Sequence, residues 1–364
     1  MSDGTTGNAP PATAPAKPLE QLFGELRPKL HRYCARMTGS VIDGEDVVQE
    51  TLLKALQAQA PSEPLSNPEG WLFRIAHNAA LDFLRRRARD QERQSEEDPD
   101  MLATATSVID SRQAVAASLR TFMQLPVAQR SSVILSDVLG HSLQETSEIV
   151  DGNLAAVKSA LQRGRQRLRT LAADAGEAPQ PALDAAQRER LTAYVERFNA
   201  HDFDAVRAML AEDVQLEVVN RVRRDSKGAI PYFTNYAARP HWQLHPGFVD
   251  GRPAALVFDG DDPDRQIKYF VLLDWSGDKV IGIRDFVSAR YVMEGATISL
   301  LAAGYPAGRV RPHRASPLAA RALARSGHGQ RPAEPGNAAA EQLAATAFAR
   351  STDLDVEFAT PCPD

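Results

Sequence analysis

The spacing of apolar positions divides the chain into helical stretches followed by strand-like stretches. Apolar residues recur every three or four positions through 19–90 and again through 108–172, which predicts α-helices in both ranges. After them come two more helical stretches and then short runs of β-branched and aromatic residues broken by Gly, Asp and Pro, a pattern typical of strands. The pattern therefore predicts two all-α domains followed by an α+β domain at 187–296.

Polar and Pro/Ala-rich stretches separate these domains and occupy the ends of the chain. Together they predict the following segments: a disordered tail (1–18), an all-α domain (19–90), a linker (91–107), a second all-α domain (108–172), a second linker (173–186), the α+β domain (187–296) and a mostly disordered tail (297–364). We therefore expect a multidomain protein with flexible connections.

Composition narrows the class of protein. At 364 residues the chain is too long for one ordinary core, and its 43% hydrophobic content supports globular folding. Its two cysteines, Cys34 and Cys362, indicate neither a disulfide framework nor a zinc site, and we expect no metal and no cofactor. The N-terminus lacks the apolar core of a signal peptide, and no apolar run is long enough to span a bilayer. We therefore expect a cytoplasmic protein without a membrane partner.

The strongest chemical signal is a basic helix at 154–170, LAAVKSALQRGRQRLRT. It carries five Lys or Arg residues and no acid, in a chain whose formal net charge is −5. Val157 and Leu161 contribute to an apolar stripe that predicts its buried face. A turn at 151–153 and a short amphipathic helix precede it, so the pattern predicts a helix-turn-helix whose second helix enters the DNA major groove. The alternative is a charged surface helix that contacts no DNA, and Gly164 weakens the helix by about 1 kcal/mol relative to Ala.

Two further helices carry patterned polar residues. In GEDVVQETLLKAL (44–56), acidic residues crowd the start of a helix whose other face is apolar, which suits the positive end of the helix dipole. In WLFRIAHNAALDFLRRRARD (71–90), an apolar stripe lies opposite a face of Arg, Asn and His, a composition that suits single-stranded or melted DNA. For each helix the alternative is an ordinary solvated face.

These three motifs together resemble a bacterial sigma factor of the extracytoplasmic function (ECF) subgroup. DGEDVVQETLLKAL resembles that family's region-two helix, which docks on the clamp helices of the RNA polymerase β′ subunit. NPEGWLFRIAHNAALDFLRRR resembles the next helix, which reads and melts the −10 element. LPVAQRSSVILSDVLGHSLQETSEIVDGNLAAVKSALQRGRQRLR resembles region four, whose helix-turn-helix reads the −35 element. The resemblance covers about residues 19–172, and it departs from the family at Gly164, usually alanine, and at 141–143.

The resemblance implies three sets of binding residues and no catalytic residue. The residues implied to face core polymerase are Asp43, Glu45, Asp46, Gln49 and Glu50. The residues implied to lie near −10 DNA are Asn78, Asp82, Arg85 and Arg86. The residues implied to face the −35 duplex are Lys158, Ser159, Gln162, Arg163 and Arg165. The loop at 58–69 is implied to hold a flipped-out base. The implied partners are promoter DNA and core RNA polymerase, through its β′ clamp helices and its β subunit.

The α+β domain resembles SnoaL-like domains of the nuclear-transport-factor-like superfamily, on FNAHDFDAVRAMLAEDVQLEVV and the strands after it. This resemblance implies a cone-shaped domain, which could be a regulatory module or an enzyme, since the superfamily includes isomerases with an Asp base. Acid and base candidates are Asp202, Asp213, Tyr232, His241 and Asp285. Candidate cavity-lining residues are Tyr232, Phe233, Tyr236, Trp242, Phe248 and Trp275. For all of them ordinary packing or a surface role is the alternative.

We predict an alternative sigma factor whose C-terminal domain is regulatory, and no enzymatic activity. A separate anti-sigma factor or a small ligand could act on that domain. The competing hypothesis is a helix-turn-helix transcriptional regulator fused to a small-ligand-binding or isomerase-like domain, which would not need the patterned helices at 43–86. We interpret the basic patch RVRRDSKG, 221–228, as a solvated loop rather than a contact surface.

Overall fold

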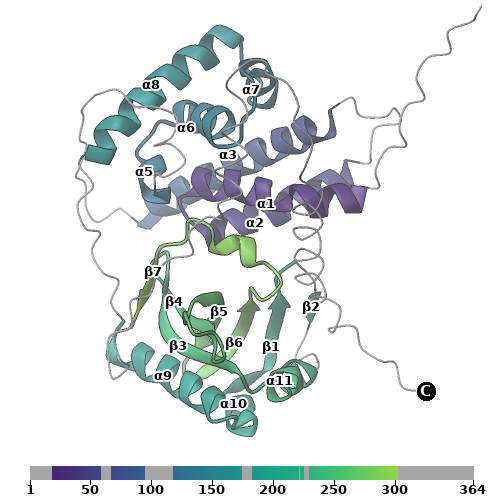
Figure 1. Cartoon of the computed structure of the whole chain (residues 1–364), viewed down its shortest axis with the longest axis vertical. Helices are drawn as coiled ribbons and strands as arrows, with labels where there is room; N and C mark the ends of the chain where they lie inside the picture. Colours follow the sequence, from purple (N-terminus) through teal and green to yellow (C-terminus); the bar gives the residue numbers. More distant parts are fainter. Residues whose placement is uncertain are drawn as a thin grey trace, which may run out of the picture. The chain divides into compact units, whose positions relative to one another are not determined.

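The computed structural model describes residues 19–58, 67–94, 118–173, 183–220, 222–224 and 229–301. They form two compact units, one helical and one α+β (Figure 1). Among the described residues, the helical unit holds those up to Asp184 together with two later segments, Gly247–Arg252 and Tyr291–Leu300, and the α+β unit holds the others up to Leu301. Among the described residues, none of the helices has both the length and the apolar character that crossing a bilayer takes.

Three long helices form the first module of the helical unit: α1 (Leu19–Thr38), α2 (Val41–Gln57) and α3 (Pro68–Gln94). Helix α1 continues through Pro28, so residues 19–38 form one helix and not two. A Cβ at Gly44 would lie 2.6 Å from the backbone of Ala35, and glycine there lets α1 and α2 pack closely. Helix α3 extends to Gln94, four residues into the segment predicted as a linker, because its polar end contains no Pro or Gly that would stop it.

In the part of the second module that the structure describes, 118–173, the elements are α5 (Leu119–Met123), α6 (Val127–Val133), the π-helical turn η1 (Ile134–Val138), α7 (Leu143–Ile149) and α8 (Leu154–Ala173). A capping box begins α7, where the Ser142 hydroxyl accepts the Glu145 N–H at 3.2 Å and the Glu145 carboxylate accepts the Ser142 N–H at 2.8 Å. Asn153 begins α8 by accepting the Ala156 N–H at 2.7 Å. These local signals confirm the predicted helix-turn-helix.

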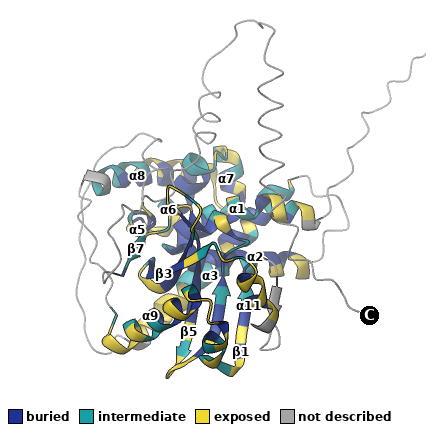
Figure 2. Ribbon diagram, turned by 60° about the horizontal axis from the view of Figure 1, so that its bottom comes forward, coloured by how far each residue is buried: buried dark blue, intermediate teal, exposed yellow. Residues whose placement is uncertain are grey.

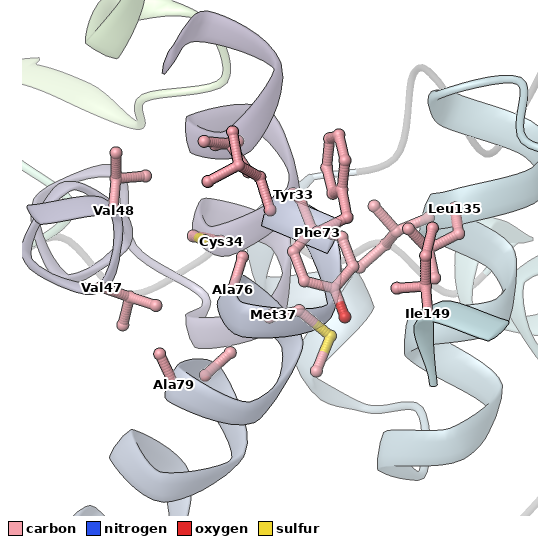
Figure 3. Packing of buried hydrophobic residues seen from close by; sticks show 14 of the residues in the cluster. Tyr33, Cys34, Met37, Val47, Val48, Phe73, Ala76, Ala79, Leu135 and Ile149 are labelled. Atoms are coloured by element: carbon pink, nitrogen blue, oxygen red, sulfur yellow. The ribbon is translucent and has the colours of Figure 1, made fainter. Parts of the chain in front are cut away.

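Both helical modules share one hydrophobic core. Tyr33 of α1 and Phe73 of α3 lie in the same buried cluster as Leu135 and Ile149 of the second module (Figure 3). The ring of Phe73 also meets that of His141 edge-on, with centroids 5.0 Å apart. Although sequence analysis predicts two separate all-α domains, the two are packed together as one unit in this structure.

A buried arginine fastens the two modules. Arg130 of α6 is 4% exposed, and its guanidinium donates to the Met37 carbonyl at the end of α1 at 2.6 Å. It also donates to the carbonyls of Met123 and Leu125 at 3.1 and 3.0 Å. Burial lowers the pKa of Arg130. The planar guanidinium carries five N–H donors, so it can donate to all three carbonyls at once.

The α+β unit confirms the predicted α+β fold. Its helices are α9 (Ala185–Asn199), α10 (Phe203–Ala208) and α11 (Ala229–Ala237). The strands of the single sheet are β1 (Leu210–Val218), β2 (Val222–Arg224), β3 (Trp242–Val249), β4 (Arg252–Asp259), β5 (Ile267–Ser276), β6 (Lys279–Asp285) and β7 (Ile298–Leu300). They run in the order β2-β1-β6-β5-β4-β3-β7, with β1 and β6 parallel. The ends of β3 and β4 and the short β7 belong to the helical unit.

Burial follows the hydrophobic pattern of these elements. Strands β4 and β5 are buried over most of their length, as their nearly continuous apolar runs predict. Helix α9 has a buried face and an exposed face (Figure 2). Its buried face contains Leu191, Tyr194, Val195 and Phe198.

Three expectations for the later chain are wrong in detail. The pattern over 188–213 predicts two helices, but the second ends at Ala208, because the chain enters β1 at Leu210. The β-branched and aromatic run KVIGIRDFVSARYVM (279–293) predicts one strand, but the strand ends at Asp285 and 290–293 forms a 3₁₀ turn, η3. Residues 298–300, placed in the disordered tail by their sequence, pair with β3 as β7. A three-residue strand gives too short an alternation for its sequence to reveal it.

Two buried histidines give the helical unit a predicted pH dependence. Burial lowers the pKa of both His31 and His77 to about 4, so both are neutral in the folded chain. In the unfolded chain each titrates near pH 6.5, so the unfolded state binds more protons between these values. We expect the thermal unfolding midpoint to fall as pH drops from about 6.5 towards 4. The variant His77→Gln should flatten this dependence, and an equally steep dependence in that variant would contradict the assignment.

Candidate polymerase and promoter surfaces

Asp43 lies in the first turn of α2 and is held by two arginines. Its carboxylate accepts from Arg87 of α3 at 3.2 Å and from Arg252, which belongs to the segment Gly247–Arg252. The Asp43 side chain is 7% exposed, whereas both arginines are about half exposed. Asp43 is therefore neutralised and covered by residues that lie 44 and 209 positions away in the sequence.

Glu45 is completely buried beside Arg27 of α1 and Tyr291 of η3. Arg27 donates to the Glu45 carboxylate, and the Tyr291 hydroxyl donates to its second oxygen at 3.0 Å. Arg27 also donates to the Tyr291 oxygen at 2.6 Å, which closes a three-residue network. Burial and the Glu45 charge raise the pKa of Tyr291, so its hydroxyl remains a donor. The prediction that five residues of this helix face polymerase therefore does not hold for Asp43 and Glu45 in this conformation, because both side chains are covered.

The two later segments also bind the ends of α1 and α2. Asp250 accepts the N–H of Val41, the first residue of α2, at 2.6 Å and the N–H of Thr297 at 2.9 Å. Burial raises the pKa of Asp250. Glu294 accepts two hydrogen bonds from Arg32 of α1, at 2.8 and 2.9 Å. Four residues from these segments, which we call the plug, cover α1 and α2: Asp250, Arg252, Tyr291 and Glu294.

Sequence reasoning missed all four plug residues. The Asp-Gly pair at 250–251 is a hairpin signal, and it indeed lies between β3 and β4. Nothing local indicates that Asp250 caps a helix 209 residues earlier. Tyr291 lies in the run 279–293, whose sequence predicts a strand.

The other predicted polymerase-facing residues remain at the surface of α2. Asp46, Gln49 and Glu50 are each partly exposed. Glu50 accepts from Arg86 at 2.8 Å and from Lys54 at 2.9 Å. Burial alone would raise the pKa of Glu50, but the hydrogen bonds from Arg86 and Lys54 outweigh it and lower the pKa. One residue implied to face polymerase is therefore paired with one implied to face −10 DNA.

The residues implied to face −10 DNA lie along α3. Asn78 and Arg85 are exposed, and Asp82 is partly exposed and forms ion pairs with Arg85 at 3.1 Å and Lys54 at 3.5 Å. Spacings of three and four residues bring Asn78, Asp82 and Arg85 to one side of the helix. The loop implied to hold a flipped base lies outside the described residues for positions 59–66.

Helix α8 presents the face predicted to contact the −35 duplex. Lys158, Ser159, Gln162 and Arg163 are exposed, opposite the buried stripe. Arg165 differs, because its guanidinium forms a two-point ion pair with the buried carboxylate of Asp137 in η1, at 2.9 and 2.5 Å. In this structure Arg165 holds α8 against η1, while the other four side chains are accessible.

Gly164 lies where α8 packs closely against α6. A Cβ there would lie 2.7 Å from Cγ2 of Val133 and 3.1 Å from the Gln129 carbonyl oxygen. We expect Gly164→Ala to destabilise the chain by up to about 2 kcal/mol, because the overpacking cost of about 1–3 kcal/mol is only partly offset by the helix-propensity gain of about 1 kcal/mol. Urea unfolding measures the change. Gly24→Ala, at a helical glycine with no atom within 4 Å of the added methyl, is the control and should stabilise. An equal gain at Gly164 would contradict the packing argument.

The α+β unit buries a carboxylate among tyrosines. Asp285 is 0% exposed and accepts the hydroxyls of Tyr232 at 2.8 Å and Tyr236 at 2.6 Å. Tyr269 forms a further hydrogen bond with Tyr236 at 2.9 Å, and the Val287 N–H donates to Asp285 at 2.8 Å. Burial raises the pKa of Asp285, against the opposing effect of the two tyrosine hydroxyls. The sequence names three of these residues but not their mutual contacts.

The candidate cavity-lining residues have different environments. Tyr232, Phe233 and Tyr236 are buried, and the ring of Tyr232 meets those of Phe233 and Tyr236 edge-on. Phe248 is buried in β3, whereas Trp242 and Trp275 are half-buried. The remaining acid and base candidates do not join Asp285: Asp202 caps α10, Asp213 is exposed on β1, and the ring of His241 contacts that of Trp242 at a tilted angle.

Comparison with protein families identifies both helical modules. Residues 22–90 match the family model for Sigma-70 region 2, and residues 119–168 match that for Sigma-70, region 4. The chain is 31% identical over 203 residues to the ECF RNA polymerase sigma factor SigG of Mycobacterium tuberculosis. The match covers 49% of this chain and 55% of SigG. The chain thus spans about half the length of that relative.

A second relative is covered more fully. The chain is 32% identical over 153 residues to the ECF RNA polymerase sigma factor SigM of M. tuberculosis, covering 42% of this chain and 76% of SigM. Among solved structures, the M. tuberculosis extracytoplasmic function sigma factor SigJ matches 74% of this chain and 95% of its own, at 20% identity and a TM-score of 0.30. With two matching sigma regions and a relative covered over three quarters of its length, this chain belongs to the ECF RNA polymerase sigma factors.

Proposed function

We propose that the chain binds core RNA polymerase, recognises the −35 and −10 elements of a promoter and promotes the initiation of transcription. The β′ clamp helices and the β subunit are the proposed polymerase contacts. Residues Asp46, Gln49 and Glu50 of α2 are the first contact surface, joined by Asp43 and Glu45 when the plug is released. Asn78, Asp82, Arg85 and Arg86 of α3 meet the −10 strand.

The observation that carries this proposal is the exposed face of α8, which is the second helix of the capped helix-turn-helix. Lys158 and Arg163 are exposed cations suited to phosphate, and Gln162 is suited to a base edge. A transcription factor that used only this motif would not need the patterned faces of α2 and α3. Their presence in the same unit favours a sigma factor over the competing helix-turn-helix regulator.

The proposed cycle requires the two helical modules to separate. The −10 and −35 elements lie about 25 base pairs apart, which is roughly 85 Å of B-form DNA at ~3.4 Å per pair. Helix α8, with its 20 residues, is only about 30 Å long. Two modules that share one core are too close together to reach both elements. We therefore propose that the chain opens on polymerase and that the packed arrangement is its closed state.

The plug is the proposed regulatory element. It covers Asp43 and Glu45 and caps α2, so it competes with any partner that binds these carboxylates. We propose that it lowers the affinity of the free chain for core polymerase. A separate anti-sigma factor or a small ligand could act by stabilising or releasing it.

The α+β unit is proposed to have no catalytic role. Catalysis by Asp285 would require substrate to reach its carboxylate, yet both of its oxygens accept hydrogen bonds and its side chain is fully buried. The tyrosine cluster instead serves as a hydrogen-bonded core.

Run-off transcription with purified core polymerase and a library of genomic promoter fragments tests the proposal. We expect the full chain to direct specific transcripts that core polymerase alone does not make. Lys158→Ala and Arg163→Ala should each reduce them, whereas Arg188→Ala on α9 should not. The absence of any transcript that depends on the chain would overturn the proposed function.

A further inference from the structure

His141 lies where the two helical modules meet, in the short segment between η1 and α7. Its ring contacts the ring of Phe73 from α3 edge-on, with centroids 5.0 Å apart, and Phe73 is completely buried. Position 141 is also one of the places where the sequence departs from the ECF pattern. A titratable side chain therefore lies at the contact that must break when the modules separate.

The environment of the His141 ring suits its neutral form. The Nε2 atom is buried and has no hydrogen-bond partner among the described residues. A neutral imidazole leaves one ring nitrogen without a proton, whereas a protonated ring carries an N–H on both nitrogens. Protonation in the packed arrangement would therefore bury an unpaired donor and part of a positive charge, which costs free energy. When the modules separate, the ring loses Phe73 and meets water, so this cost disappears.

Burial and three charged groups act on this ring. Burial is the largest effect and lowers the pKa of His141 below its usual 6.5, although Glu69 of α3 and Glu145 of α7 favour the charged ring. Lys29 of α1 opposes the charge. Both carboxylates already have partners, Glu69 in Lys29 at 3.0 Å and Glu145 in the Ser142 N–H at 2.8 Å. The packed arrangement therefore binds this proton more weakly than a separated arrangement does.

We propose that His141 is a pH-sensitive latch: the neutral ring permits the two helical modules to pack together, and protonation of the ring favours their separation. This rests on the proposed function, in which the separated arrangement reaches both promoter elements. Because the closed state binds fewer protons, its stability is fully present above about pH 6.5 and decreases as the pH falls below that value. Acidification then makes more of the chain competent to bind core polymerase.

One titrating group limits the size of the effect. The equilibrium constant for opening changes by at most about tenfold per pH unit when one proton is taken up. Between pH 7.5 and 5.5 it should therefore rise by up to about tenfold, since a ring in water becomes mostly protonated over that interval.

Fluorescence energy transfer in the full chain measures the separation of the modules. One dye is attached at Gln57→Cys, at the exposed end of α2, and the other at Arg120→Cys, which is exposed on α5. Cys362→Ser removes one native thiol, and Cys34 does not compete for dye because it is completely buried and burial raises its pKa. We expect the transfer to decrease reversibly from pH 7.5 to 5.5, while the far-UV circular dichroism stays unchanged.

Two variants and a control assign the effect to this ring. His141→Leu and His141→Gln each remove the titrating group, and both should abolish most of the decrease while keeping the transfer seen at pH 7.5. His201→Asn is the matched control, because His201 is an exposed histidine of the α+β unit whose φ of 58° asparagine tolerates. It should respond to pH as the wild type does.

Three results would overturn the latch: no decrease in the wild type, an undiminished decrease in both His141 variants, or a decrease that accompanies loss of the circular dichroism signal, which would report unfolding. None of them bears on the proposed function. That function fails instead if run-off transcription at pH 7.5 gives no transcript that depends on the chain.

Discussion

Replacing both Arg252 and Tyr291, as Arg252→Ala with Tyr291→Phe, should raise the affinity of the chain for core RNA polymerase about tenfold. These side chains supply the plug's hydrogen bonds to Asp43 and Glu45. A charge-assisted hydrogen bond is worth about 1.5–3 kcal/mol when buried, and less for the half-exposed Arg252, so a net change near 1.4 kcal/mol is expected. Fluorescence anisotropy of labelled chain titrated with core polymerase measures the affinity.

The control for this variant is Arg265→Ala, an exposed arginine in the loop between β4 and β5. It should leave the affinity unchanged. If the double variant instead bound core polymerase more weakly, the plug would support the bound form and the proposed inhibitory role would be wrong. Far-UV circular dichroism of both proteins verifies that the fold is retained.

Arg130→Met should cause the largest loss of stability of any single change considered, about 3 kcal/mol or more. The substitution keeps an unbranched apolar stem and removes the donors to Met37, Met123 and Leu125. The buried carbonyls of Met37 and Leu125 and the part-buried carbonyl of Met123 then lose this donor, each at a cost of up to about 1–3 kcal/mol that local relaxation partly offsets. Urea unfolding of the full chain, followed by far-UV circular dichroism, gives the change in the free energy of unfolding.

Two further variants make that result specific. Arg120→Ala, at an exposed arginine of α5, should change stability by less than about 0.5 kcal/mol. Arg130→Lys keeps the charge but not the planar fork, so it should lose most of the stability that Arg130→Met loses. Wild-type stability in Arg130→Lys would mean that charge, and not the geometry of the three carbonyls, determines the contribution.

Elements with local signals could be predicted from the sequence. Ser142 with Glu145, and Asn153 before α8, are capping signals that lie within four residues of the groups they satisfy. The long apolar stripe of α3 likewise indicates its helix without tertiary contacts. The strand runs of the α+β unit are equally legible, because each is long enough to show its apolar character.

Contacts between distant parts of the chain could not be predicted. The burial of Glu45 depends on Arg27 and Tyr291, and residue type alone favours an exposed carboxylate. Arg165 carries the signature of a DNA contact, yet Asp137 binds it across the packing of α8 on η1. The polar pattern therefore indicates which helices carry charged surfaces, while the folded chain decides which of those charges remain accessible.

The affinity of the chain for core RNA polymerase, with and without the charges of α2, tests the central claim most directly. Asp46→Asn with Glu50→Gln preserves shape and removes two charges from the face proposed to bind the β′ clamp helices. We expect this variant to bind core polymerase at least about tenfold more weakly than the wild type, while Glu189→Gln on α9 binds as the wild type does. Equal affinity for all three proteins would contradict the assignment of this face to polymerase.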